Sequence, residues 1–161
     1  MKPRRDREHC EPGAGSWFRL ELPSDPRALP WVSHGLRGFF RATGWSRRHA
    51  FHLELAVNEA LDNAMSHGNR LRPGAVVRLE IEDCETGVRI DVVDQGAGFD
   101  PASLDPIARR NETLAERGRG VALMRRLMDE IDFQSGPRGT RLRMTKRRPA
   151  GRTAHRLPKA S

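Results

Sequence analysis

Residues 75–94 read AVVRLEIEDCETGVRIDVVD, and this stretch decides the fold class. Apolar and charged residues alternate on both sides of a turn at Thr86 and Gly87, and alternation with a period of two is typical of half-buried strands. We therefore predict an antiparallel pair of strands with one face toward a core and the other toward water. The buried face of the second strand would end at Asp94, a carboxylate that needs a partner there.

The segments on either side of this pair predict helices packed on a sheet. Apolar residues recur at steps of three and four after two expected N-caps, Asp25 and Ser46, and the second of these helices would end at Gly68 and Asn69. The remaining expected elements are a strand at 16–22, a third helix carrying Val121 to Ile131, and a closing hairpin of 131–135 with 140–145. The predicted fold class is α+β, a two-layer sandwich with helices on one face of a mostly antiparallel mixed sheet.

The chain's 161 residues are 37% hydrophobic and 31% charged, which suits one folded domain. We expect this domain at 16–145, between a disordered N-terminal tail at 1–15 and a basic disordered tail at 146–161. The basic tail holds six Lys and Arg and no acid, so most of the formal charge of +8 lies outside the domain. A nucleic-acid-binding protein is therefore not expected. The sequence also has no apolar run typical of a membrane span or a secretory signal, which predicts a cytoplasmic protein.

The chain has two cysteines, Cys10 and Cys84, one in a polar segment and one at the end of a predicted strand. A structural zinc site would need four ligands at tight spacing. A domain of this length does not need a disulfide to build a core. We therefore expect two reduced thiols.

Residues 54–69, ELAVNEALDNAMSHGN, hold the first candidate cluster. Glu59 and Asn63 stand four residues apart, so they would be neighbours on one flank of the predicted helix. An amide oxygen is a suitable ligand for Mg²⁺, and a carboxylate can orient or deprotonate an attacking hydroxyl or water. Taken alone, the same spacing also fits two solvated surface residues.

Residues 94–99, DQGAGF, hold the second cluster. Gly96 and Gly98 would let the backbone turn sharply and approach a ligand closely. A buried Asp94 carboxylate can accept a hydrogen bond from an exocyclic amine, but a glycine-rich turn that binds nothing fits the same residues. Residues 99–117 then predict a long loop, of the kind that commonly forms a functional lid.

Residues 116–130, ERGRGVALMRRLMDE, hold the third cluster. Gly118 and Gly120 would precede the third helix and leave amide groups at the positive end of its dipole, where anions and phosphates bind. Arg117 and Arg119 would add positive charge to such a site. The alternative is a flexible hinge before a core helix.

Together, the three clusters resemble the N, G1 and G2 boxes of the GHKL superfamily of ATPases and kinases, with EALDNA at 59–64, DQGAG at 94–98 and GRGV at 118–121. Within that superfamily the chain is most similar to the bacterial anti-sigma-factor serine kinases and their stand-alone histidine-kinase-like relatives. The sequence LMDE at 127–130 is typical of the anti-sigma branch. The likeness covers nearly all of the predicted domain and implies a Bergerat-type ATP-binding fold.

The resemblance also implies a role for each candidate residue. Glu59 would be the general base, Asn63 the Mg²⁺ ligand and Asp94 the acceptor for the adenine amino group. The other implied nucleotide-binding residues are Gly96 and Gly98 beneath the nucleotide, Gly118 and Gly120 at the hinge of a phosphate-binding lid, Arg117 or Arg119 for neutralising phosphate charge, and Thr140 near the adenine. ATP and Mg²⁺ are therefore the expected cofactors.

The function that the resemblance implies is that of an ATP- and Mg²⁺-dependent serine/threonine protein kinase acting as an anti-sigma regulatory factor. Such a protein works by partner switching: it phosphorylates a small anti-sigma antagonist and alternatively sequesters a sigma factor. An ATP-gated partner-binding regulator without kinase activity is the alternative, because Glu116 stands near a position where some relatives carry an arginine. The resemblance leaves a homodimer open, and it implies no contact with nucleic acid or membrane.

Overall fold

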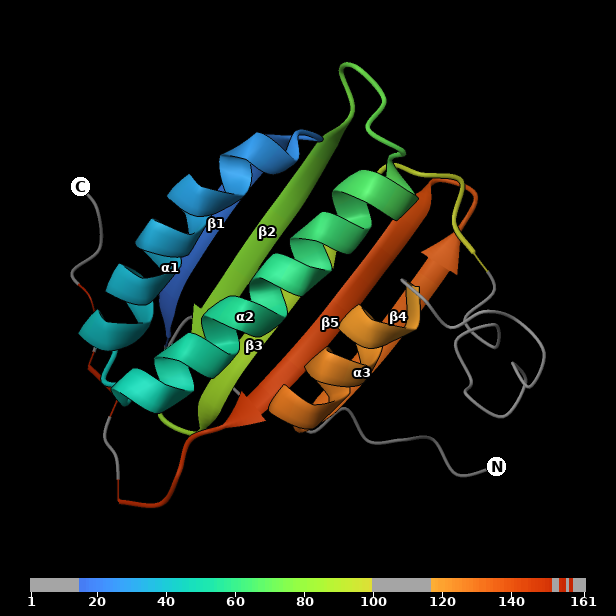
Figure 1. Cartoon of the computed structure of the whole chain (residues 1–161). Helices are drawn as coiled ribbons and strands as arrows, with labels where there is room; N and C mark the ends of the chain where they lie inside the picture. Colours follow the sequence, from blue (N-terminus) through green and yellow to red (C-terminus); the bar gives the residue numbers. More distant parts are fainter. Residues whose placement is uncertain (1–14, 100–116, 152–153, 156, 158–161) are drawn as a thin grey trace, which may run out of the picture.

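The computed structural model describes residues 15–99, 117–151, 154–155 and 157, with the backbone only for 117–118. These residues form two layers, in which three helices cover one face of a five-stranded sheet (Figure 1). The strands are β1 (Ser16–Pro23), β2 (Val76–Asp83), β3 (Gly87–Val93), β4 (Glu130–Gly136) and β5 (Gly139–Arg147). The helices are α1 (Leu29–Ala42), α2 (Arg47–Asn63) and α3 (Arg117–Leu127).

The strands form one sheet in the order β1-β2-β3-β5-β4. β2 and β3 are the antiparallel pair that alternation predicts, and their register sets Ile81 opposite Ile90. Each described pairing is antiparallel, so the sheet is more regular than the mixed sheet that we expect from sequence. The predicted α+β sandwich is confirmed.

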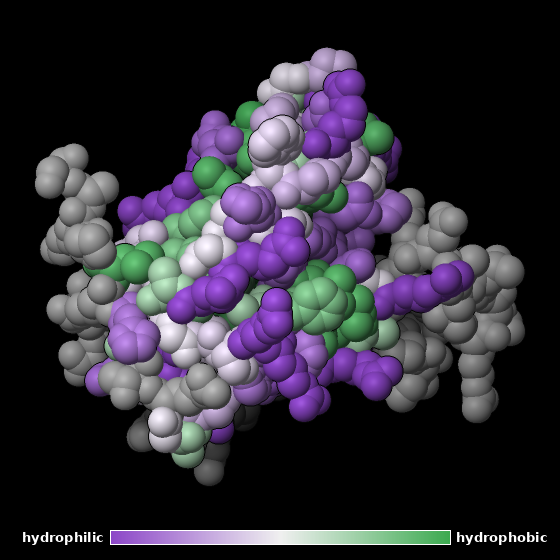
Figure 2. All heavy atoms as spheres, turned by 60° about the vertical axis from the view of Figure 1, so that its left-hand side comes forward, coloured by the Kyte–Doolittle hydropathy of each residue, from purple (hydrophilic) through white to green (hydrophobic). Residues whose placement is uncertain are grey.

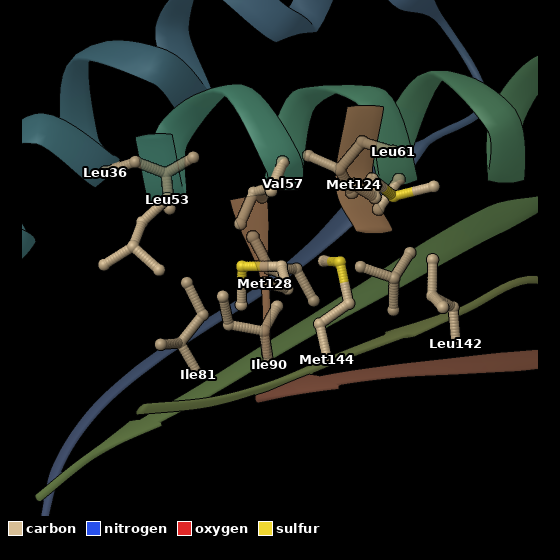
Figure 3. Packing of buried hydrophobic residues seen from close by; sticks show 14 of the residues in the cluster. Leu36, Leu53, Val57, Leu61, Ile81, Ile90, Met124, Met128, Leu142 and Met144 are labelled. Carbon is tan, nitrogen blue, oxygen red and sulfur yellow. The ribbon is translucent and has the colours of Figure 1, made fainter. Parts of the chain in front are cut away.

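The core lies between the helices and the sheet, and α2 runs across its middle (Figures 1 and 3). Leu53, Val57 and Leu61 project from α2 at helical spacing toward the side chains of Ile81 and Ile90, and each of the five is at most 1% exposed. Full burial of a side chain of this size stabilises the fold by about 1.5–3 kcal/mol. This packing fixes where the C-terminal end of α2 meets the sheet.

Both expected N-caps accept a backbone hydrogen bond. Ser46 Oγ accepts from the His49 N–H at 3.3 Å and begins α2, as predicted. Asp25 Oδ1 accepts from the Arg27 N–H at 3.0 Å, but it caps the 3₁₀ turn η1 (Pro26–Ala28), which precedes α1. The proline-rich start of the first predicted helix thus folds as a tighter turn before the α-helix begins.

The C-terminal end of α2 is not regular. The α-helix ends at Asn63, and the π-helical turn η2 (Ala64–Gly68) continues it. The helical segment therefore ends at Gly68, in agreement with the prediction from Gly68 and Asn69. π-helical turns are rare and frequently lie at functional sites. Asn63 stands at the junction between the two helix types.

The third helix differs from its prediction at both ends. α3 begins at Arg117, so Gly118 and Gly120 lie in its first turn instead of ahead of it. Packing of α3 against α2 outweighs the low helix propensity of glycine here. α3 ends at Leu127, and Ile131 belongs to β4. A single apolar residue fits the helical period and the strand period equally well, and the pairing of Ile131 with β5 decides for the strand.

The fold extends beyond the predicted domain boundary at residue 145. β5 runs to Arg147, and Arg148 is only 8% exposed. The Arg148 Nη2 lies 2.7 Å from Asp83 Oδ2, and its guanidinium carbon lies 4.5 Å from the centroid of the Trp45 ring. Burial raises the pKa of Asp83, and the hydrogen bond from Trp45 and the charge of Arg148 oppose that rise. Arg148 is therefore part of the folded domain.

The substitution Arg148→Ala is expected to lower the free energy of unfolding by about 3 kcal/mol or more, because it leaves the Asp83 carboxylate buried without its cation. Urea unfolding at neutral pH measures the change. Arg147→Ala is the matched control, since the Arg147 side chain is exposed, and its effect should stay within about 0.5 kcal/mol. Equal stabilities of the two variants would contradict the importance of this ion pair.

The expectation of two reduced thiols was wrong for Cys84, which is disulfide-bonded. Cys84 directly follows β2, and a Cβ built on Gly15 would lie 2.6 Å from the carbonyl oxygen of Asp83. The chain that enters β1 therefore passes beside Cys84, a proximity that spacing in the sequence does not reveal. Cys10 lies outside the described residues.

The surface is mixed in polarity. On the face shown in Figure 2, hydrophilic residues lie between smaller hydrophobic areas. The exposed large apolar side chains come from different parts of the chain, namely Trp17, Trp31, Phe51, Leu71 and Phe99. Among the helices that the structure describes, none combines the length and the apolar character that crossing a membrane requires.

Candidate functional site

A cavity of about 320 Å³ lies where the end of α2 meets the end of β3. Its apolar lining comes from α2, η2, β3, α3, β4 and β5, and includes Ala60, Val92, Val121, Phe133 and Leu142. A volume of this order and a mainly apolar lining are typical of pockets for small organic ligands. Because six elements contribute to it, with η2 among them, the cavity depends on how the helices pack on the sheet.

Four of the predicted site residues line this cavity together: Asn63, Asp94, Gly98 and Thr140. Asn63 is the last residue of α2, Asp94 and Gly98 follow β3, and Thr140 is the second residue of β5. Residues from the first and second clusters therefore meet in one place. The antiparallel pairing of β3 with β5 brings the end of β3 beside the start of β5.

Asp94 is 6% exposed, and only one of its carboxylate oxygens accepts hydrogen bonds within the described part of the chain. Its Oδ1 accepts hydrogen bonds from the N–H groups of Gly96 at 2.8 Å and Thr140 at 3.0 Å. Its Oδ2 accepts none from the residues that the structure describes. Burial raises the pKa of Asp94, and the two N–H donors oppose that rise. The cavity wall therefore presents a fixed, unused acceptor.

Two glycines let the Asp94 turn approach the end of α2. A Cβ on Gly68 would collide with the Asp94 carboxylate, and a Cβ on Gly96 would collide with the carbonyl oxygen of Gly68. The structure thus uses Gly96 for close packing of two backbone segments and does not bring it to the cavity wall. Gly98 lines the cavity and has a φ of +76°, a conformation that favours glycine.

Glu59 and Asn63 both face the first turn of α3. A Cβ built on Gly120 would lie 2.7 Å from Glu59 Oε2 and 3.3 Å from Asn63 Nδ2. The third cluster therefore meets the first, and the absence of a side chain at Gly120 makes room for the carboxylate. Glu59 is half-buried and stands one helical turn before Asn63, at the edge of the cavity and outside its lining.

The remaining predicted residues are placed less closely. Arg117 and Gly118 begin α3, and the Arg117 side chain lies outside the described residues. Arg119 is exposed and does not line the cavity. The predicted lid loop lies almost entirely in residues 100–116, which are also outside the description. Thr140 is buried, and its Oγ1 lies 3.0 Å from Ser135 Oγ.

Other lining residues were not singled out as site residues from the sequence. His67 and Arg70 also line the cavity. Phe99 and Phe133 also line it, with ring centroids 5.6 Å apart and the rings at 76°. Phe99 directly follows the glycine-rich turn, and this position next to the second cluster could have indicated that it lines the site. Phe133 lies in a predicted strand, which by itself does not indicate a role in the site. No sequence signal indicated Arg70.

The residues present fit an adenine nucleotide. Apolar walls suit a flat heterocycle, and the free Asp94 Oδ2 suits an exocyclic amine as donor. The Asn63 amide oxygen suits Mg²⁺, which takes one or two protein ligands and completes its shell with phosphates and water. Among the described residues, no group of three or more His, Cys, Asp or Glu can hold a metal by itself. A metal ion held by Asn63 would complete its shell with phosphate oxygens and water.

Comparisons of the sequence with known proteins agree with this chemistry. A family model described as the histidine kinase-like ATPase domain matches residues 22–146. The chain is 34% identical over 110 residues to the serine/threonine-protein kinase BtrW of Bordetella bronchiseptica, which is 66% of this chain and 74% of that protein. It is 30% identical over 139 residues to the serine-protein kinase RsbW of Bacillus licheniformis, which is 83% of this chain and 86% of that protein.

An anti-sigma F factor of Clostridium botulinum is 32% identical over 98 residues, which is 59% of this chain and 68% of that protein. Among solved structures, the RsbU and RsbW domains of a Mycobacterium tuberculosis protein align with a TM-score of 0.55 and 21% identity. That alignment covers 83% of this chain and 33% of the other, so this chain spans about a third of that structure. At this identity the structural likeness concerns the fold.

Proposed function

The chain belongs to the family of histidine kinase-like ATPase domains, in the anti-sigma kinase branch of the GHKL superfamily, and from this premise we propose that it is an ATP- and Mg²⁺-dependent serine/threonine protein kinase. It phosphorylates a small anti-sigma antagonist and, in its other partner state, sequesters a sigma factor. One observation carries the proposal: Glu59 and Asn63 face the same glycine of α3, and Asn63 shares a cavity with the free oxygen of Asp94.

In this proposal the chain's residues divide the work by position. Asp94 Oδ2 accepts a hydrogen bond from the adenine amino group and orients the base between the apolar walls. Asn63 holds Mg²⁺, which neutralises phosphate charge when bound. Glu59 Oε2 takes the proton from the attacking serine or threonine hydroxyl of the antagonist. Phosphoryl transfer needs little more than such positioning and charge neutralisation.

The second candidate function is an ATP-gated regulator that binds a partner without phosphorylating it. The close approach of Gly120 to the Glu59 carboxylate favours it, because a Cβ on Gly120 would leave the proposed base no room in its present position. In this candidate, nucleotide binding moves the first turn of α3 and thereby changes the surface offered to the partner. Asp94 and Asn63 keep the same roles, and Glu59 has no chemical role.

An assay of phosphoryl transfer separates the two functions. The chain is incubated with Mg²⁺, ATP labelled in the γ-phosphate, and each anti-sigma antagonist protein encoded in the same genome. The kinase proposal predicts labelled phosphoserine or phosphothreonine on one of them. An antagonist that binds only in the presence of ATP and never acquires phosphate supports the regulator instead.

Gly120→Ala is expected to slow phosphoryl transfer about tenfold without destabilising the protein. The added methyl group pushes the flexible end of Glu59 out of place, and small misplacements of a reacting group are costly. Stability should stay level or rise, because alanine forms helices better than glycine. Gly38→Ala in α1 is the control, since a Cβ there meets nothing within 4 Å. It should stabilise the fold and leave the transfer rate unchanged, and equal rates for the two variants would contradict the role of Gly120.

Binding of adenosine is expected to weaken as the pH falls, because a protonated Asp94 carboxyl no longer offers a free acceptor. Burial raises the pKa of Asp94 above its ordinary value of 3.8, so the loss begins at a higher pH than for an exposed aspartate. Calorimetric titration of adenosine between pH 8 and pH 4 measures this, without interference from phosphate groups. An affinity that stays constant down to the ordinary aspartate range would contradict the proposed contact.

A further inference from the structure

Asn69 is a buried amide whose polar atoms bond to three separate segments. It directly follows η2 and is 3% exposed. Its Nδ2 donates to Ser24 Oγ at 2.6 Å and to the carbonyl oxygen of Val76 at 2.9 Å. Its Oδ1 accepts from the Gln95 N–H at 2.7 Å. Asn69 thus ties the end of the α2 segment to the chain after β1, to the start of β2 and to the turn after β3.

The chain after Asn69 adopts a conformation that does not form without support. Arg70 and Leu71 have φ values of +53° and +52°, in the left-handed region that side chains other than glycine disfavour. The Arg72 Nη2 donates to the carbonyl oxygen of Gln95 at 3.2 Å, so a second bond joins the same two segments. The hydrogen bonds of Asn69 and Arg72 to Gln95 therefore stabilise a strained turn. That turn places Arg70 at the cavity.

The position of Asn69 connects this support to Asp94. On one side it follows Gly68, whose missing Cβ leaves room for the Asp94 carboxylate. On the other side it bonds the N–H of Gln95, the residue after Asp94. Asp94 therefore lies between Gly68, which precedes Asn69 in the sequence, and Gln95, which is hydrogen-bonded to Asn69. Asn69 thereby fixes the distance between the end of the α2 segment and the turn that carries Asp94.

We propose that Asn69 is a positioning residue for the cavity: its three hydrogen bonds set the Asp94 carboxylate against Gly68 and so orient the free Oδ2 for an exocyclic amine. The part that concerns the ligand rests on the proposed adenine site. The part that concerns Asp94 itself does not, since it can be tested in the protein without nucleotide.

The first test follows the Asp94 carboxyl by NMR titration in the full chain without nucleotide. In Asn69→Ala, the Asp94 pKa is expected to fall toward its ordinary value of 3.8, because the carboxyl separates from Gly68 and gains water. An unchanged Asp94 pKa in a folded Asn69→Ala variant would overturn the proposal. This readout does not depend on what the cavity binds.

The second test measures the dissociation constant of adenosine by calorimetry, at a temperature where each variant is folded. Asn69→Ala should weaken binding about tenfold, the scale of losing one or two buried hydrogen bonds. Asn58→Ala is the control: Asn58 donates to Ser33 Oγ at 2.7 Å and stands apart from the cavity lining. It should lower Tm and leave the adenosine affinity as in the wild type. A role in folding alone would make the two variants behave alike, with lower Tm and unchanged affinity.

Ser24→Ala covers the case in which Asn69→Ala does not fold. It removes one of the three bonds of Asn69, and it should shift the Asp94 pKa in the same direction and weaken adenosine about two- to threefold. No change in either quantity would overturn the proposal. A wild-type protein that binds no adenosine but shows the Asp94 shift in Ser24→Ala would contradict the proposed adenine contact and still support the positioning role.

Discussion

Glu59→Gln is expected to slow phosphoryl transfer to the antagonist by about 10²–10⁴-fold, the usual range for a general base. Glutamine keeps the size and the hydrogen-bonding reach of glutamate, but its amide cannot take up the hydroxyl proton. The affinity for ATP should remain that of the wild type, because Glu59 does not line the cavity. Single-turnover transfer from labelled ATP measures the rate, and calorimetry measures the affinity.

The matched control for Glu59 is Asp62→Asn on the same helix. The Asp62 carboxylate accepts from Ser66 Oγ at 3.3 Å and does not line the cavity, so its loss should change the transfer rate less than about twofold. A Glu59→Gln variant that transfers phosphate as fast as this control would remove Glu59 from the mechanism. A variant that loses ATP binding together with transfer would assign Glu59 to binding instead of proton transfer.

Asp94→Asn is expected to weaken ATP and adenosine binding by about 100-fold or more. The asparagine carbonyl takes over the two N–H donors of Gly96 and Thr140, which turns the amide nitrogen toward the position of Oδ2. The amide nitrogen of the asparagine and the amino group of adenine, both donors, then face each other, where the wild type has a donor and a charged acceptor. A hydrogen bond to a charged group is worth about 1.5–3 kcal/mol. Calorimetric titration measures the loss.

The fold should survive Asp94→Asn. Burial disfavours the charged form of Asp94, so a neutral side chain of the same shape relieves that cost while keeping both backbone bonds. Thermal unfolding checks this, and Asp132→Asn on the exposed side of β4 is the control with unchanged affinity. A folded Asp94→Asn variant with wild-type affinity for adenosine would contradict the placement of the base at Asp94.

Periodicity predicts the parts of this fold that bury regular apolar faces. The alternation around Thr86 and Gly87 predicts the β2–β3 pair, and the Ser46 cap predicts the start of α2, because both depend on local chemistry. Ile131 shows the limit of this reasoning, since one apolar residue fits both a helix and a strand and only pairing with β5 decides. The buried pair of Arg148 with Asp83 was missed because a basic tail without periodicity carries no sign of its distant partner.

The residues of the candidate site can be predicted where they belong to sequence motifs, but not where only contacts between distant segments define their role. The boxes indicate Asn63 and Asp94, which the structure brings to one cavity. They do not indicate Asn69, because three partners far apart in the sequence give a buried amide its importance. They also do not indicate Arg70, which reaches the cavity through a left-handed turn that no sequence signal announces.

Calorimetric titration of ATP into the wild-type chain, with and without Mg²⁺, tests the central claim most directly, because it needs no partner. We expect one nucleotide to bind per chain and its affinity to rise clearly when Mg²⁺ is present, since the proposed ligand Asn63 would hold the ion together with phosphate oxygens and water. A folded wild-type protein that binds no ATP, with or without Mg²⁺, would contradict the nucleotide site and the kinase proposal built on it.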